Sequence, residues 1–176
     1  MCIRDRHSPS PKASPNKLAD DDISADSLPL EAFAGTYSDA GYGTFTLCAP
    51  TDTSHYCDSV ISAFRALNST ITEKPVLLGR WPRLWAKYLR GLRIRDGNRF
   101  ILGITDLYPE GYGLDKTPFE TSAFSDGSED GPYAEFVVED GKVVGFGMFG
   151  FIGEETERQR VGKTVEERAE VWFHCV

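Results

Sequence analysis

The Asp140-Gly141 pair is the feature that most constrains what this chain can fold into. Two segments rich in valine and aromatic residues flank it, and they predict a hairpin from Tyr133 to Phe149. An Asp-Gly pair supplies the positive φ angles that both central residues of a type I′ turn require. This segment is the clearest hairpin signal in the sequence, and it indicates an antiparallel sheet.

A two-residue loop also fixes the register of this hairpin. It would pair Val138 with Val143 and set Phe136 opposite Gly145. Gly145 and Gly147 would then leave room for a ring from the facing strand, or for strong curvature of a barrel.

Short β-rich segments joined by turn residues recur along the rest of the chain. Gly35 and Gly41 are interpreted as turns, and the remaining predicted strands are Tyr42–Cys48, Val76–Leu78, Tyr88–Arg95, Arg99–Tyr108, Phe119–Phe124 and Arg168–Val176. The predicted fold class is therefore mainly β, with about eight short strands in a closed antiparallel barrel.

One short helix is expected, from Asp58 to Leu67, because its apolar residues follow helical spacing and Asp58 or Ser59 can cap its start. The segment from Trp81 to Arg95 is ambiguous, since its first half fits one face of a helix. From Tyr88 onward its residues alternate as in a strand, so a strand is favoured there.

Residues 1–29 do not read as part of the fold, and the barrel domain is predicted to span residues 30–176. Met1 to Arg6 resembles a translated sequencing-adapter scar of the kind found in metagenomic assemblies. Ser8 to Pro15 is a Ser/Pro-rich linker, and Asp20 to Asp22 keep the chain solvated. Such a linker is expected to join the barrel to another domain.

The formal net charge of −8 argues against general binding to nucleic acid, because a phosphate backbone would repel the chain. No apolar run approaches the roughly 20 residues that span a bilayer, so no membrane partner is expected. A basic run nevertheless stands out: Arg80, Arg83, Lys87, Arg90, Arg93, Arg95 and Arg99. It is either a solvated strand face, which is preferred, or a surface that docks a negatively charged neighbour.

The cysteines and a sequon bear on the compartment. Cys48 and Cys57 bracket a short polar loop that a disulfide could close, with roughly 2–3 kcal/mol of stabilisation. Asn68-Ser69-Thr70 is an N-glycosylation sequon, so Asn68 is a candidate glycosylation site. Together they predict a secreted, extracellular protein. The expected signal peptide is not found in this sequence, which suggests that it belongs to an upstream part.

No catalytic set, metal site or cofactor site is predicted. His7, His55 and His174 lack ligand spacing, and the cysteines contain no C-x-x-C arrangement. Ser14-Pro15-Asn16-Lys17 matches the Ser-x-x-Lys acylation motif, but it lies in the Pro-rich linker rather than at a helix start, so the match is treated as coincidence.

Aromatic residues make up 12% of the chain, which fits either a packed core or a ligand cavity lined with rings. An eight-stranded barrel is the size at which either outcome occurs. The packed core is preferred for Phe45, Phe100, Phe136 and Phe146.

Several segments together resemble one family, the C-terminal lipocalin-like domain of fungal β-lactamase-related serine hydrolases. The resemblance covers about Leu28 to Val176, and the segments that carry it are Leu28–Tyr37, Gly41–Cys48, Pro109–Gly113, Ala134–Gly147 and Glu167–Phe173. It implies a lipocalin-like barrel that is accessory to a catalytic domain holding the serine, lysine and tyrosine of the reaction. None of those catalytic positions is present here.

The resemblance implies a non-catalytic accessory domain that packs on, or gates, the catalytic domain of a secreted serine hydrolase. That domain, which precedes the barrel in the family, is then the expected partner. The alternative is a free-standing lipocalin-type carrier that binds an apolar small molecule in the barrel.

Overall fold

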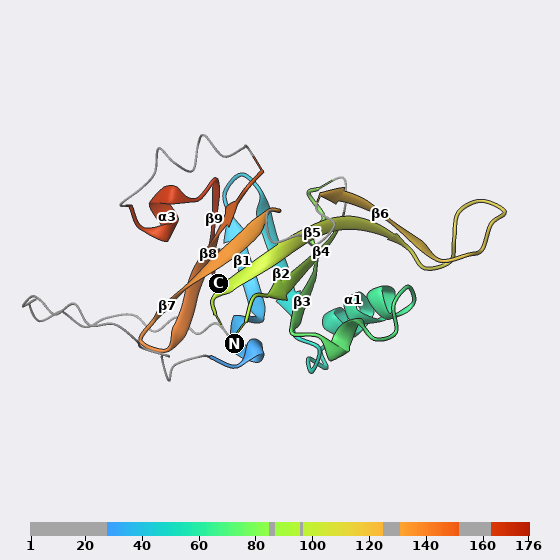
Figure 1. The fold of residues 1–176 in the computed structure, drawn as a ribbon, viewed down its shortest axis with the longest axis horizontal. Helices are drawn as coiled ribbons and strands as arrows, with labels where there is room; N and C mark the ends of the chain where they lie inside the picture. The colour runs from blue at the N-terminus through green and yellow to red at the C-terminus, as the bar shows by residue number, and fades with distance from the viewer. Residues whose placement is uncertain (1–27, 85–86, 96, 125–130, 152–162) are drawn as a thin grey trace, which may run out of the picture.

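Eight antiparallel strands close into a barrel in the computed structural model of the chain (Figure 1). The structure describes residues 28–84, 87–95, 97–124, 131–151 and 163–176. Its strands are β1 (Gly35–Asp39), β2 (Gly43–Cys48), β3 (Val76–Arg80), β4 (Tyr88–Arg93), β5 (Arg99–Tyr108), β6 (Phe119–Phe124), β7 (Tyr133–Glu139), β8 (Lys142–Phe149) and β9 (Val171–Cys175). The mainly β, closed-barrel fold class is confirmed. The predicted linker lies outside the described residues.

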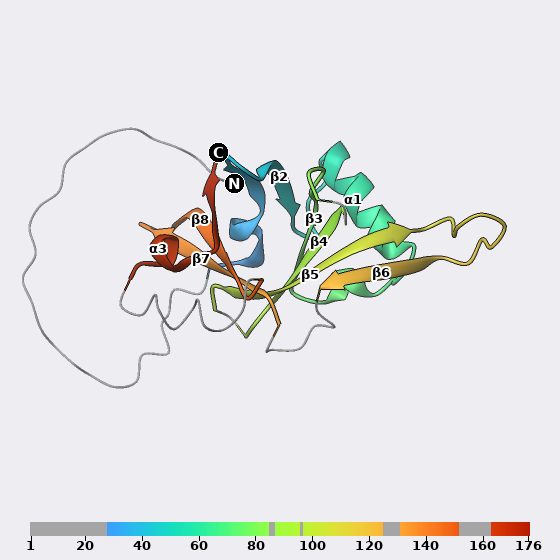
Figure 2. The same cartoon turned by 90° about the horizontal axis from the view of Figure 1, so that it is seen from above.

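The barrel closes because β5 pairs with different strands along its length. One edge of β5 pairs with β7 at residues 99–101 and then with β6 at residues 104–108, while its other edge pairs with β4 at residues 100–105. The sheet order is β4-β3-β2-β1-β9-β8-β7-β5, and the β4–β5 pairing completes the circle. β6 pairs with β5 alone among the described strands, so the β5–β6 hairpin extends away from the barrel (Figure 2).

Two strands differ from the prediction: β1 belongs to the barrel but is not among the predicted strands, and β6 is predicted in the barrel but lies outside it. Gly35 is the first residue of β1 rather than a turn, while the turn at Gly41 is present and carries hydrogen bonds to Asp39 Oδ1. β1 is short, and of its five residues Tyr37 alone is buried. The Tyr37 hydroxyl donates a hydrogen bond to Phe33 O at 2.8 Å. β6 was predicted as one of the barrel strands, and it is a strand that lies outside the circle.

The β7–β8 hairpin turns at Asp140 and Gly141 with φ angles of 50° and 72°, as the sequence predicts. Val138 pairs with Val143, but Phe136 lies opposite Phe146 rather than Gly145. The register shifts between Val137 and Val138 because β8 contains one extra residue there, a β-bulge that the alternation pattern does not reveal.

Gly145 and Gly147 give room to neighbouring side chains, as expected. A Cβ added at Gly145 would come within 2.6 Å of the Trp172 ring of β9, and one at Gly147 within 3.1 Å of the Phe149 ring. The absence of side chains at these positions therefore permits the close approach of strands and rings that the curved sheet requires.

The expected helix is present as α1 (His55–Arg65), but it begins earlier than predicted. Ser54, rather than Asp58 or Ser59, caps it by accepting a hydrogen bond from Cys57 N. Two short 3-10 helices, η1 (Leu30–Phe33) and η2 (Ile71–Glu73), and a second short α-helix, α3 (Val165–Arg168), are also present. α3 has a capping box between Thr164 and Glu167, and it occupies the start of the segment predicted as the last strand.

The predicted β4–β5 hairpin is confirmed, and alternate residues of β4 face the interior of the barrel. Leu89, Gly91 and Arg93 are buried, whereas Tyr88, Arg90 and Leu92 are only half-buried. The turn residue Asp96 lies outside the described residues.

Two apolar clusters hold these elements together. The larger cluster fills the barrel with rings from several strands and from η1, among them Phe33, Tyr37, Phe45, Phe100, Phe136, Phe146 and Phe173. The smaller cluster lies between α1 and the outer face of β2 and β3, and it includes Phe64, Ile71, Leu78 and Leu107. The second cluster also anchors the base of the β5–β6 hairpin through Leu107.

Candidate functional site

The interior of the barrel is packed with aromatic rings. Phe146 stacks on Phe173 with ring centroids 5.1 Å apart, and Phe45 meets Phe173 edge-on at 5.1 Å. A cavity among the rings, lined by residues such as Leu77, Phe100 and Phe136, measures about 10 Å³. That space suits one water molecule at most, so the packed core preferred from the sequence is present at this part of the barrel.

The residues that the structure describes contain no group of three or more His, Cys, Asp or Glu side chains that could hold a metal ion. His174 accepts a hydrogen bond from Trp172 Nε1 at 3.1 Å, and His55 lies at the start of α1. His7 and the Ser14–Lys17 motif lie outside the described residues. No described helix has the length and apolar content needed to cross a membrane.

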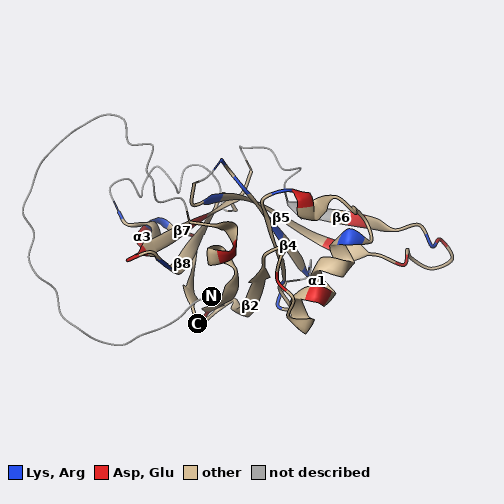
Figure 3. Cartoon of the chain, turned by 90° about the horizontal axis from the view of Figure 1, so that it is seen from below, with Lys and Arg blue, Asp and Glu red and all other residues tan. Residues whose placement is uncertain are grey.

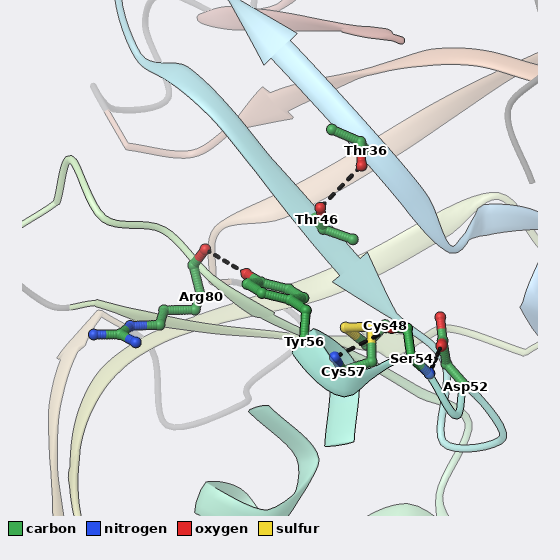
Figure 4. Close-up of a disulfide and its surroundings, with 8 residues drawn as sticks. All are labelled: Thr36, Thr46, Cys48, Asp52, Ser54, Tyr56, Cys57 and Arg80. Carbon is green, nitrogen blue, oxygen red and sulfur yellow. Dashed lines mark hydrogen bonds between the residues drawn. A yellow bond between two sulfur atoms is a disulfide. The ribbon is translucent and has the colours of Figure 1, made fainter. Parts of the chain in front are cut away.

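The predicted disulfide between Cys48 and Cys57 is present, with Cα atoms 5.5 Å apart (Figure 4). It joins the end of β2 to the first turn of α1, and both cysteines are buried. Tyr56 lies beside it and donates from its hydroxyl to Arg80 O at 3.1 Å. Partial burial raises the pKa of this tyrosine. The disulfide is consistent with an extracellular location.

The candidate glycosylation residue Asn68 is exposed in the turn that follows α1. Its Oδ1 accepts hydrogen bonds from Thr70 N at 3.1 Å and from Thr70 Oγ1 at 3.0 Å. Asn68 and Thr70 are therefore already held together, while the disulfide lies at the opposite end of the same helix.

The structure does not bring the basic run together as one docking surface. Arg90 pairs with Glu120 at 3.2 Å, and Arg83 donates to Gly41 O at 2.9 Å. The Arg99 guanidinium lies 4.0 Å from the centre of the Tyr133 ring. Arg93 is buried among rings. The exposed members of the run agree with the preferred interpretation of solvated strand faces, whereas Arg90 is half-buried and Arg93 is buried; the exposed members are Arg80, Arg83, Lys87, Arg95 and Arg99.

The most exposed apolar surface among the described residues lies on the β5–β6 hairpin, which we call the arm (residues 104–124). Tyr112 is 73% exposed and Leu114 is 101% exposed, and both lie in the loop of residues 109–118 (Figures 1 and 2). Tyr108 stacks on Phe119 at 4.6 Å and meets Tyr112 edge-on at 6.0 Å. Aromatic residues thus run from the base of the loop to its tip.

The tip is an ordered turn rather than an irregular loop. Tyr112 N donates to Asp115 O at 2.8 Å and Asp115 N donates to Tyr112 O at 3.2 Å, so Gly113 and Leu114 are the two central residues. Gly113 has a φ of 62°, the positive value that a type II′ turn needs at its first central position. The turn therefore holds Leu114 at the apex, in contact with solvent.

Gly111 allows the two sides of the loop to cross closely. It has a φ of 75°, and a Cβ there would lie within 2.6 Å of Lys116 Cα. Because the obstructing atoms belong to the backbone, no rotamer change can relieve the overlap. The residue is required to be glycine for this loop to exist.

Charged groups flank the apolar tip. The Glu110 and Asp115 side chains are exposed, and Lys116 Nζ donates to Gly113 O at 3.1 Å (Figure 3). Hydrogen bonds from Thr117, the backbone N–H first, lower the pKa of Asp115. The tip consequently presents a leucine and a tyrosine beside the acidic side chains of Glu110 and Asp115.

Sequence reasoning missed the arm as a site. Gly111-Tyr112-Gly113 is one of the segments that carry the family resemblance, and two glycines around an aromatic residue in a loop are also a turn signal. The pattern could not show that β6 lies outside the barrel, because an arm strand and a barrel strand have the same local composition.

Compared with protein-family models, curated proteins and solved structures, the chain matches none of them. The resemblance to the C-terminal domain of β-lactamase-related serine hydrolases therefore stays a prediction.

Proposed function

We propose that this chain is a non-catalytic accessory β-barrel of a secreted β-lactamase-related serine hydrolase, and that it works by packing on the catalytic domain. The observation that carries the proposal is the contrast between a filled interior and an apolar arm. The barrel cavity of about 10 Å³ leaves no room for a ligand there, whereas Tyr112 and Leu114 are presented outward on an ordered turn. Such a molecule acts through its outer surface.

The arm has the properties of a protein contact. A rigid turn loses little conformational freedom on binding, and tyrosine is among the residues that most often supply binding energy at interfaces. The carboxylates of Glu110 and Asp115 complement a partner surface that has basic side chains around an apolar pocket. The same charges disfavour an anionic membrane surface as the partner.

Secretion is part of the proposal, and two features support it. The Cys48–Cys57 disulfide suits an oxidising compartment, and the Asn68 sequon is exposed with its Thr70 hydroxyl already bonded to the asparagine. Neither feature bears on the reaction of the parent enzyme, which the family resemblance alone supplies.

The full-length gene provides the test. We expect its reading frame to encode Ser-x-x-Lys and Tyr-x-Asn upstream of the barrel, and the full-length protein to hydrolyse nitrocefin or a p-nitrophenyl ester. The present chain alone should turn over neither substrate. A reading frame without those motifs, or turnover by this chain, would remove the proposal.

The role of the arm is tested in the same full-length protein. Leu114→Asp should weaken the contact between barrel and catalytic domain, measured as increased susceptibility to limited proteolysis between them and as a changed KM. The matched control is Lys142→Asp, an exposed residue beside the β7–β8 turn. Equal effects of the two substitutions would show that the arm is not the contact.

The carrier hypothesis drawn from the sequence makes a separate prediction. Binding of an apolar ligand inside the barrel should quench the fluorescence of Trp81, which is buried against Phe45 with centroids 5.0 Å apart. Because that site is filled by rings, we expect no response to a panel of fatty acids and aromatic compounds. A saturable response would favour the carrier over the accessory domain.

A further inference from the structure

A groove of about 210 Å³ lies between the end of α1 and the start of β6 in the arm. Phe64 and Leu67 contribute the helix side, Phe119 contributes the arm side, and the Arg90–Glu120 ion pair lies between them. Asn68 is on the rim of this groove. The groove is smaller than the pockets that hold drug-sized ligands, and both apolar and hydrogen-bonding groups line it.

The sequon places the Asn68 side chain in a defined orientation beside the groove. Asn68 N donates to Phe64 O at 3.0 Å, which ties the residue to the last turn of α1. Its Oδ1 accepts from both Thr70 N and Thr70 Oγ1. These bonds engage Oδ1, whereas Nδ2 is the atom that N-glycosylation modifies, and the residue is exposed.

We propose that Asn68 carries an N-linked glycan and that the groove is the seat of its first N-acetylglucosamine. In the transfer, the Asn68 Nδ2–C1 bond forms while the bond between C1 of the sugar and the phosphate of a polyprenyl-diphosphate oligosaccharide breaks. Nδ2 loses one proton, and the polyprenyl diphosphate leaves with the electron pair of the broken bond. The inference depends on passage through a secretory pathway and is independent of the accessory function.

The groove has the chemistry that a pyranose ring needs. The C–H face of a sugar is apolar and packs on aromatic rings, and Phe119 offers a ring that is 40% exposed. The hydroxyl and acetamido groups can hydrogen-bond to the partly exposed Arg90 and Glu120 side chains. Because the glycan is covalently tethered at the rim, the sugar reaches the groove without the entropic cost of a separate association.

Occupancy of the site is tested first, by expressing this chain behind a secretory signal in a glycosylating eukaryotic host. Intact-mass spectrometry should show one N-glycan, which Asn68→Gln and Thr70→Ala remove. Thr70→Ser keeps the sequon and should keep the glycan, and Ser69→Ala serves as the matched control at the neighbouring position. A secreted chain without a glycan on Asn68 would overturn the inference.

Seating of the first sugar is tested by trimming. An endoglycosidase that leaves a single N-acetylglucosamine should keep the thermal midpoint, whereas the same chain made in a host that does not glycosylate, with Asn68 unmodified, should have a midpoint lower by about 2–4 °C. In Phe119→Ser this difference between trimmed and glycan-free protein should vanish. Comparing the two differences cancels the loss of the Tyr108–Phe119 stack itself.

A displaced glycan is the final control. In the Asn68→Gln protein, Asp52→Asn creates a sequon with Ser54, where Asp52 Oδ1 already accepts from Ser54 N at 2.9 Å. Asp52 does not line the groove, so the trimmed protein and the same variant made without a glycan should have equal thermal midpoints. If Asn68 is glycosylated but the first sugar gives no stabilisation, or gives the same amount in Phe119→Ser, the groove is not its seat.

Discussion

The guanidinium carbon of Arg93 lies 4.7 Å from the centre of the Phe33 ring, inside the barrel. Arg93 is only 8% exposed, and its Nε donates to Gly97 O at 2.8 Å. The same guanidinium lies 5.9 Å from the Phe100 ring. One arginine therefore joins η1, β4, β5 and the turn between the last two, in a cluster that is otherwise apolar.

Replacing Arg93 should destabilise the barrel strongly. Arg93→Ala removes the contacts with two rings and the hydrogen bond to Gly97, so we expect a loss of about 2–4 kcal/mol in the free energy of unfolding. Arg93→Lys should recover only part of it, because an ammonium lacks the planar face. Urea denaturation measures both variants. Arg83→Ala, on an exposed arginine bonded to Gly41 O, is the control and should cost less than about 1 kcal/mol.

Opening the Cys48–Cys57 disulfide should lower stability without changing the fold. The bridge closes a loop with a sequence separation of 9, for which the chain-entropy model gives about 2–3 kcal/mol. We expect the double variant Cys48→Ala/Cys57→Ala to unfold at a lower urea concentration and to keep its far-ultraviolet spectrum. A double variant as stable as the parent protein would mean that the bridge does not constrain the unfolded chain.

Gly111→Ala should disrupt the arm and leave the barrel intact. The added Cβ would overlap the backbone of Asp115 and Lys116, whereas Gly113→Ala meets no atom within 4 Å and has only an unfavourable φ. Limited proteolysis within residues 109–118 should therefore be much faster in Gly111→Ala than in Gly113→Ala. Because the arm lies outside the barrel, the thermal midpoint of the barrel should change little in either variant.

The order of the arm tip should depend on pH through Asp115. Its folded-state pKa is lowered from 3.8 by hydrogen bonds from Thr117, so the ionised carboxylate stabilises the turn. That stabilisation is present above pH 3.8 and is lost as the pH falls through the lower folded-state pKa. The amide resonance of Thr117 should titrate with a midpoint below 3.8, and Asp115→Asn should abolish the titration. A midpoint at or above 3.8 would contradict the bond between Asp115 Oδ1 and Thr117 N.

Local signals in the sequence predicted the features that neighbouring residues determine. Asp140 and Gly141 specify their turn, the apolar spacing specifies α1, and the loop between Cys48 and Cys57 is short enough for a disulfide. The exclusion of β6 from the circle depends on the pairing of β5 with the distant strand β7. The β-bulge in β8 is local to its hairpin, but the alternation of residues does not reveal it. The sequence around Arg93 does not reveal that this residue is buried, because Arg93 belongs to a run of basic residues most of which are exposed.

The candidate site was harder to predict than the fold for a related reason. Exposure of Leu114 follows from the crossing at Gly111 and from the position of β6, which pairs with no described strand other than β5. A single leucine in a polar loop indicates neither the close crossing of the backbone at Gly111 nor the position of β6 outside the barrel. The site therefore emerges only when the whole topology is known.

Because β5 pairs with β7 over only a few residues, the two ends of this strand have different roles. The same ten-residue β5 seals the circle at its start and leaves it at its end. Substitutions or insertions in the loop after Tyr108 are consequently not limited by the close packing of aromatic rings inside the barrel. Changes in the sequence of this one loop can therefore give the protein a new binding specificity, while the barrel that supports the loop keeps its structure.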